Sequence, residues 1–282
     1  MIIDGTDIRT LGMFILRNGS NDFLSFPARR DPDVNDWAEH DGLDVDFSDL
    51  SFNPKKVAVQ LYISAPTESL FNQRLNTFQN LHFQPGYRNI YVEEFQKTFS
   101  LRFLGFGEYT HKGGLAKSGK KSGRLTVEYM MDDPVQLFNP TPTLPQGEGA
   151  SATHIQLNGV DLSQYGIIVK EIYSTGLRPA SPKSTLERSF NHISGTWADV
   201  GIIRKKESKQ VTIDCVMSAG TLSEFYNNYN ALFGVMNSTA PIELSTPDTD
   251  RLCYYKAMSN FTKLTIFSKK VRVGFQLIFQ TI

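Results

Sequence analysis

Two stretches of this chain repeat each other at a fixed separation, and this internal repeat limits the possible folds more than any other feature. Residues 3–8 match residues 157–162, and every matched position lies 154 residues further along the chain. The same separation relates the alternating block 57–63 to the block 211–217, and a Ser-Ala pair follows both blocks. We interpret these ordered matches as the duplication of one module.

Each copy carries the same turn and helix signals. The Asp-Gly pair at 4–5 and the Asn-Gly pair at 158–159 indicate tight turns, because glycine adopts positive φ without strain. Thr67 and Thr221 are good N-caps for one helix in each copy. Apolar side chains then recur at i, i+4 and i+7, which places one stripe against a sheet. The stripes are Phe71, Leu75 and Phe78 in the first copy and Phe225, Tyr229 and Leu232 in the second.

Alternation of apolar and polar residues predicts the strands around these helices. The expected strands cover 13–17, 57–63, 88–95, 98–106 and 123–131 in the first copy, and 167–173, 209–217, 241–245, 251–259 and 271–281 in the second. About seven strands with a single helix predict a mainly β (α+β) fold. We expect two similar β-sandwich or barrel domains, each with one packed helix.

The boundary between the copies is expected at residues 139–150. This segment contains three prolines and two glycines, which make a stiff connector without donors for a continuing strand ladder. The sequence therefore predicts a first domain at 1–138, a linker at 139–150 and a second domain at 151–282.

Charge and cysteine content argue against several kinds of partner. The chain has 29 Lys and Arg against 29 Asp and Glu, so no net charge draws it to nucleic acid or to an acidic membrane. No run of eighteen apolar residues occurs, and the first residues lack the features of a signal peptide, so we expect no membrane partner. Cys215 and Cys253 are expected to be free buried thiols of a protein assembled in a reducing cytoplasm.

No pattern typical of catalysis is present, so we expect no enzyme, no catalytic residue and no cofactor. The five histidines have no metal-binding spacing, and no Gly-x-Ser-x-Gly elbow occurs. The acidic run at 31–49 begins like a calcium loop, but Asp36 replaces the turn glycine and Gly42 replaces the bidentate glutamate. We expect no metal there and interpret the run as a solvated loop or a subunit contact.

The segment 105–123 combines glycines with Lys112, Lys117, Lys120 and Lys121, without meeting the phosphate-binding P-loop pattern. One interpretation is the tip of a long β-hairpin. The functional interpretation is an arm that grips a neighbouring subunit or lines a channel for DNA. Because a neighbour's strand can satisfy open strand edges, we expect this segment at an oligomer interface.

The two copies differ in charge at corresponding places. Residues 1–140 have 15 Lys and Arg against 18 Asp and Glu, whereas residues 150–282 have 14 against 10. The stretch after the first tryptophan is acidic, and the stretch after the second is basic. We expect copy one to meet copy two head to tail, in another subunit or within the same chain. The residues predicted at this interface are Asp44, Asp46, Arg204, Lys205 and Lys206.

Residues 157–169 resemble the opening of the ring domain in the distal tail (Dit) proteins of long-tailed bacteriophages. The residues that carry the resemblance are Leu157, Asn158, Gly159, Val160, Asp161, Leu162, Tyr165 and Gly166. The later order of an alternating strand, one helix and closing strands is also similar. The resemblance implies a homohexameric ring that joins the tail tube to the hub or fibres, with DNA passing only in transit through the lumen.

The sequence departs from that family in two ways. The Gly-Arg-Gly-like stretch of the ring domain is replaced by Gly195-Thr196-Trp197 in the second copy and by Asn35-Asp36-Trp37 in the first. In addition, the second domain repeats the first, where the family has a lectin-like sandwich. Two equivalent domains in one chain open the alternative of a trimer with pseudo-sixfold symmetry, as in tail hubs.

These observations lead to one main hypothesis and several alternatives. The main hypothesis is a virion structural protein of a phage or prophage tail tip or baseplate, made in the bacterial cytoplasm and located at the tail tip. The alternatives are a trimeric hub, a carbohydrate- or receptor-binding tail module, and an enzyme with convergent titratable groups in a pocket.

Overall fold

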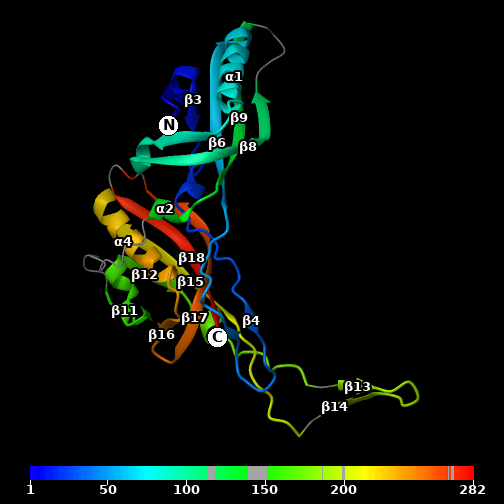
Figure 1. The fold of residues 1–282 in the computed structure, drawn as a ribbon. Helices are drawn as coiled ribbons and strands as arrows, with labels where there is room; N and C mark the ends of the chain where they lie inside the picture. Colours follow the sequence, from blue (N-terminus) through cyan, green and yellow to red (C-terminus); the bar gives the residue numbers. More distant parts are fainter. Residues whose placement is uncertain (113–117, 139–150, 186, 199–200, 266, 268–269) are drawn as a thin grey trace.

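The chain folds into two seven-stranded antiparallel sheets, each with one long helix, as seen in a computed structural model (Figure 1). The structure describes residues 1–282 except 113–117, 139–150, 186, 199–200, 266 and 268–269. The predicted linker at 139–150 therefore lies outside the described residues. The expected mainly β fold with two similar units is confirmed.

The first sheet has the strand order β2-β1-β7-β8-β9-β6-β3. Its strands are β1 (Ile2–Ile3), β2 (Thr6–Asp7), β3 (Met13–Ile15), β6 (Lys55–Thr67), β7 (Tyr87–Val92), β8 (Lys97–Lys112) and β9 (Ser118–Met131). Along β6, successive side chains alternate between a buried and a more exposed face, and Val57, Val59, Leu61 and Ile63 lie on the buried face, as the period of two predicts.

The second sheet has the equivalent order, β11-β10-β16-β17-β18-β15-β12. Its strands are β10 (Gln156–Leu157), β11 (Val160–Asp161), β12 (Ile167–Glu171), β15 (Gln210–Ala219), β16 (Ile242–Ser245), β17 (Asp250–Lys263) and β18 (Val271–Thr281). Each strand takes the place that its counterpart has in the first sheet. The two sheets thus have one topology, and we refer to the parts of the chain that form them as the first half and the second half.

The opening turn shows how closely the halves agree. Asp4 and Asn158 both have a positive φ and are followed by a glycine that also has a positive φ. The side-chain oxygen of Asp4 accepts a hydrogen bond from the backbone N–H of Asn89 at 2.8 Å. Asn158 accepts the equivalent bond from Glu243, also at 2.8 Å. An acidic residue and its amide counterpart therefore fix the same turn against the same strand in both halves.

The next feature that the two halves share is a glycine at the end of a short 3-10 helix. Gly12 and Gly166 end short 3-10 helices with φ values of 64° and 71°. A Cβ atom at Gly12 would lie 2.5 Å from the carbonyl oxygen of Ser64, and one at Gly166 would lie 2.5 Å from that of Ser218. Both positions need glycine because of the left-handed backbone and because of this close approach.

The long helices begin and end 154 residues apart. They are α1 (Glu68–His82) and α4 (Leu222–Met236), and the hydroxyls of Thr67 and Thr221 accept N-cap hydrogen bonds from the backbone three residues on. The predicted caps are confirmed. The predicted stripes pack as expected, and Phe71, Phe78, Phe225, Tyr229 and Leu232 are buried.

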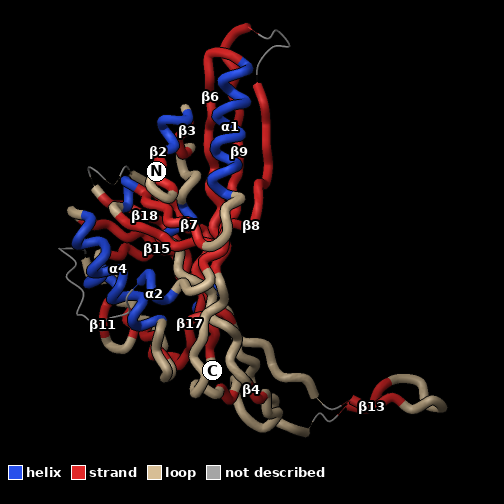
Figure 2. Tube along the Cα trace, turned by 45° about the horizontal axis from the view of Figure 1, so that its top comes forward, coloured by secondary structure: helices blue, strands red, loops and turns tan. Residues whose placement is uncertain are grey.

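The remaining elements are short. They are the strand pairs β4 (Val34–Asn35) with β5 (Asp44–Val45) and β13 (Glu187–Ser189) with β14 (Thr196–Ala198), the helices α2 (Val135–Phe138) and α3 (Tyr173–Gly176), and the 3-10 helices η1 (Ile8–Leu11), η2 (Asn21–Phe23), η3 (Glu93–Phe95) and η4 (Leu162–Tyr165). The hairpin β13–β14 projects away from the body of the molecule (Figures 1 and 2).

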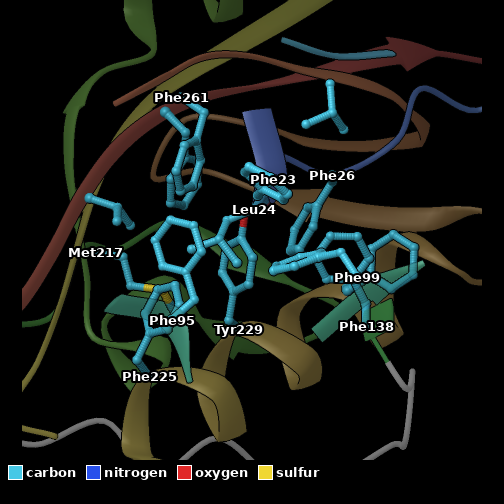
Figure 3. Packing of buried hydrophobic residues seen from close by; sticks show 14 of the residues in the cluster. Phe23, Leu24, Phe26, Phe95, Phe99, Phe138, Met217, Phe225, Tyr229 and Phe261 are labelled. Carbon is cyan, nitrogen blue, oxygen red and sulfur yellow. Dashed lines mark hydrogen bonds between the residues drawn. The ribbon is translucent and has the colours of Figure 1, made fainter. Parts of the chain in front are cut away.

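Buried apolar residues from both halves form one cluster. The apolar cores of the two halves are continuous, because side chains of the first half such as Phe26 pack on Tyr229 of α4 (Figure 3). This continuity makes the junction between the halves the feature of the fold that most needs explanation.

Candidate functional site

The loop between β3 and β6 carries aromatic residues of the first half onto the helix of the second half. Phe26 stacks on Tyr229 with ring centroids 4.3 Å apart, and it also contacts Phe233 at 4.9 Å. Phe138 of α2 meets the same cluster, edge-on to Phe26 at 5.2 Å (Figure 3). Aromatic pairs of this kind add to the hydrophobic gain of burying the rings.

Two buried tyrosine hydroxyls fix the position of this loop. Tyr229 donates a hydrogen bond to the carbonyl oxygen of Leu24 at 2.7 Å, and Tyr255 donates one to Pro27 at 3.0 Å. Both tyrosines belong to the second half and both acceptors to the first. A buried carbonyl that lost such a partner would be left unsatisfied, so these bonds give the junction a defined register.

Polar groups surround the apolar contact. The Lys263 ammonium lies 2.9 Å from the hydroxyl of Ser20 and 2.5 Å from the carboxylate of Glu94. Tyr226 donates to the carbonyl oxygen of Phe95 at 2.7 Å. Because the lysine is almost fully buried, its pairing with a carboxylate satisfies a charge that would otherwise be costly.

Lys55 is a second buried lysine, at the start of β6. Its ammonium donates to the carbonyl oxygen of Ser25 and lies 5.9 Å from the centre of the Phe138 ring. Burial lowers the pKa of Lys55 to about 7, although nearby Asp22 opposes the shift. Burial has this effect because it disfavours the charged form of a lysine.

Residues 28–53 form an extension that we call the first arm, and it lies along the second half. The backbone N–H of Arg29 donates to the carbonyl oxygen of Lys256 at 2.9 Å. The Arg29 guanidinium is buried between the rings of Phe47 and Tyr254, at 5.4 and 5.6 Å from their centres. Such cation–π contacts offset part of the cost of burying the charge.

The tip of the first arm meets a basic part of the second half. The Lys183 ammonium lies 2.5 Å from a carboxylate oxygen of Asp36 and donates to the carbonyl oxygen of Gly42 at 2.8 Å. Asp41 accepts a hydrogen bond from the backbone N–H of Lys206 at 2.6 Å. This bond and the nearby lysines, Lys205 among them, lower the pKa of the Asp41 carboxyl.

Opposite charges of the two halves therefore do meet, within one chain. The contact uses Asp36 and Asp41 of the first half, with Lys183 and the backbone of Lys206 of the second. A place for Asp44 and Asp46 at an oligomer interface stays a prediction. Asp44 accepts from the indole N–H of Trp37 at 3.4 Å, and Asp46 accepts from the backbone of Ser48 at 2.8 Å. Both bonds stay inside the first arm, and both carboxylates are exposed. Arg204, Lys205 and Lys206 lie at the base of the projecting hairpin, with Arg204 and Lys206 exposed.

The predicted lysine-rich segment belongs to the first sheet. Lys112 ends β8 and is exposed, Lys120 is exposed on β9, and Lys121 is buried. Lys117 lies outside the described residues. The ring of His111 packs edge-on against Phe71 of α1 at 5.2 Å, so β8 runs along the chain's own helix. Its role at an oligomer interface stays a prediction.

The groups considered for metal or redox chemistry lie apart. Among the described residues, no group of three or more His, Cys, Asp and Glu could hold a metal ion. Cys215 and Cys253 are both free and buried, and burial raises the pKa of both thiols, to about 12 for Cys253. Thiols of this kind are poor nucleophiles.

One buried polar pair was not predicted from the sequence. His82, at the end of α1, lies 2.6 Å from the hydroxyl of Tyr129 through Nε2 and 2.8 Å from the carbonyl oxygen of Phe78 through Nδ1. Burial lowers the pKa of the imidazole. Because both ring nitrogens are engaged inside the core, the pair links α1 to β9.

The projecting hairpin of the second half was not predicted from the sequence. We call residues 181–207 the second arm, excluding 186 and 199–200, which are outside the described residues. It contains the hairpin β13–β14, which projects into solvent (Figure 1). Exposed apolar side chains gather on it, and these are Phe190, Ile193, Trp197, Ile202 and Ile203. A high apolar content in a polar loop would have been the signal.

Comparisons with known proteins give only weak likeness. No protein-family model matches this chain, and none of the curated proteins is similar to it. Among solved structures, the Dit protein (gp 19.1) of phage SPP1 is similar at 11% identity and a TM-score of 0.35, over 99% of this chain and 96% of that one. That protein is described as a paradigm of the hub adsorption apparatus in phages that infect Gram-positive bacteria. A TM-score this low does not establish a common fold.

Across the described residues, the structure contains no helix that is both long and apolar enough to cross a membrane.

Proposed function

We propose that this protein is a non-enzymatic structural component of a phage or prophage-derived tail tip or baseplate. In this proposal it forms a ring that joins the tail tube to the hub or fibres. One observation carries the proposal: two halves of the same topology associate through unlike surfaces, the loop of one against the helix of the next. A module that binds its own copy head to tail is suited to building rings.

The opening motif supports the same assignment. Residues 157–169, which resemble the ring domain of distal tail proteins, form β10, β11, η4 and β12. Within them, Asp161 accepts a hydrogen bond from the N–H of Ser163 at 2.8 Å and caps η4. The motif residues thus have a structural purpose in the turn that opens the unit.

The partners follow from this proposal. They are further copies of the chain, the tail tube, and the hub or fibre proteins, with DNA present only in transit through the lumen. Assembly would take place in the bacterial cytoplasm and the finished ring would be at the tail tip. Two equivalent units per chain also favour a second candidate, a hub of three chains with pseudo-sixfold symmetry.

Negative-stain microscopy combined with multi-angle light scattering tests the proposal. We expect closed rings with a central pore, and a mass of three or six chains. A protein that stays monomeric at tens of micromolar, without rings on the grid, would show that the proposal is wrong.

A further inference from the structure

The second arm is the counterpart of the first arm. Each arm is closed by two backbone hydrogen bonds and carries a two-stranded hairpin. The closing bonds join Arg30 to Ser51 and Asn53 to Ala28 at 2.9 Å in the first arm, and Lys183 to Lys205 and Glu207 to Ser181 at 2.7 Å in the second. The paired residues of the hairpins are Val34 with Val45 and Asn35 with Asp44, and Glu187 with Ala198 and Arg188 with Trp197.

The two arms differ in what they touch. The first arm lies on the second half of its own chain, through Arg29 and Asp41. The base of the second arm contacts the first arm through Lys183 and Lys206, and its hairpin extends away from the body (Figures 1 and 2). On it, Trp197 is 56% exposed and Ile203 is 88% exposed. Large apolar side chains gathered on one projecting element are typical of a surface that binds another protein.

The surface next to the second arm is also exposed to solvent, unlike its counterpart in the first half. In the first half, Leu24 precedes the arm and is 1% exposed, because the second half covers it. Leu177 precedes the second arm at the corresponding place and is 50% exposed. Lys55 and Lys209 also correspond, since both donate to carbonyl oxygens of these loops, and Lys209 is the less buried of the two.

The surface that receives the first arm on β17 has a counterpart on β8. Tyr255 and Met258 of β17 contact the loop of the first half. Phe103 and Phe106 of β8 hold the corresponding positions. Tyr255 and Met258 pair with Phe279 and Leu277 of β18. Phe103 and Phe106 pair in the same way with Tyr129 and Val127 of β9, the strand that corresponds to β18.

An aromatic patch occupies this counterpart surface. We define it as Phe83, Phe103, Leu104 and Phe106. The rings of Phe103 and Phe106 are 5.0 Å apart, and Phe83 lies 6.2 Å from Phe103. Phe83 is 65% exposed and Leu104 is 40% exposed. The equivalent surface of the second half is covered by the first half, whereas here Phe83 and Leu104 are exposed and Phe103 and Phe106 are half-buried.

We propose that the second arm and Leu177 of one copy cover the aromatic patch of another copy, and so repeat between chains the contact that joins the halves within a chain. The exposed second arm and Leu177 belong to the second half, and the aromatic patch belongs to the first. Each copy therefore offers one of each, and the contact propagates head to tail until a ring closes. This inference rests on the proposed ring function and names the surfaces that build the ring.

The contact between chains differs from the junction in its hydrogen bonds. The two tyrosines that donate across the junction, Tyr229 and Tyr255, have Leu75 and Phe103 at the corresponding positions, which offer no hydroxyl. The repeated contact is therefore more purely hydrophobic. Assembly should be reversible on dilution, whereas the junction stays closed.

Two variants with exposed substitutions test the proposal. The arm variant combines Trp197→Ser with Ile203→Ser, and the patch variant combines Phe83→Ser with Leu104→Ser. Phe14→Ser is the matched control, because Phe14 is also half-exposed but lies on β3, away from both surfaces. We expect each double variant to raise the dissociation constant between copies by about thirty-fold or more, whereas the control keeps the mass of the wild type in light scattering.

Mixing the two variants gives a sharper result. The intact patch of the arm variant can accept the intact arm of the patch variant, so an equimolar mixture should form heterodimers that grow no further. This also shows that both variants are folded. If the wild type forms rings and the double variants keep its mass, the assigned surfaces are wrong. If the wild type stays monomeric, the ring function fails, and the inference that rests on it fails too.

Discussion

Replacing Lys55 by methionine would show how much the closed junction depends on a buried amine. The side chain is 8% exposed and lies between Ser25 and Phe138. Methionine has a similar length and can fill the same space without a charge. The variant therefore removes one titrating group while keeping most of the packing.

The direction of the pH dependence follows from the pKa of Lys55 in the folded and unfolded states. The pKa of Lys55 is about 7 in the folded protein against the usual lysine value of 10.5 in the unfolded chain. Between these values the unfolded chain binds more protons, so the free energy of unfolding rises with pH. The slope is about 1.4 kcal/mol per pH unit, and the penalty fully present below pH 7 amounts to roughly 5 kcal/mol, which is an upper bound.

The assay is urea unfolding of the wild type and of Lys55→Met at several pH values from 7 to 9. The stability of the wild type relative to the variant should increase by about 2 kcal/mol over this range, because all other titrations cancel in the difference. Lys209→Met serves as the control, since Lys209 is the less buried counterpart, and its difference should change much less. A difference between wild type and Lys55→Met that does not vary with pH would refute the burial of a shifted amine.

Three further outcomes are expected. Gly12→Ala should destabilise the fold by about 2 kcal/mol or more in denaturant unfolding, because of the positive φ and the 2.5 Å approach to the carbonyl of Ser64, and an unchanged midpoint would contradict this. Tyr229→Phe should cost about 1–3 kcal/mol by leaving a buried carbonyl of the first half unsatisfied, which thermal unfolding would measure. Cys215 and Cys253 should resist thiol reagents at pH 8 until the protein unfolds, because their pKa values are raised, and rapid labelling of the native protein would show otherwise.

The sequence was informative where local chemistry decides the structure. The turn glycines, the threonine caps and the alternating blocks depend on neighbours along the chain, so the repeat predicted one topology for both halves, and the sheets have it. The helices α1 and α4 also begin and end at positions that are 154 residues apart, the separation found in the sequence. These features need no knowledge of how the halves meet.

The junction could not be predicted in the same way. Nothing local distinguishes Phe26, which is buried against the second half, from an aromatic residue in a solvated loop. The same holds for Lys55, whose surroundings come from distant segments. Within the chain, Asp36 and Asp41 are the carboxylates that meet the second half, because the geometry of the first arm decides which of its carboxylates reach that surface. The place of Asp44 and Asp46 at an oligomer interface stays a prediction.

The way in which the two copies diverged gives a physical reason for their different exposure. The first half places Leu24 and Phe26 at the junction, where they are buried as soon as the chain folds. At the corresponding face, the second half has Leu177 and the projecting arm, which stay exposed in a single copy. Soluble monomers rarely expose large contiguous apolar patches, so a face that is exposed before assembly is limited in its apolar area. Under the proposed assembly, a copy that folds alone and then binds its neighbour has one strong interface inside the chain and one weaker interface between chains.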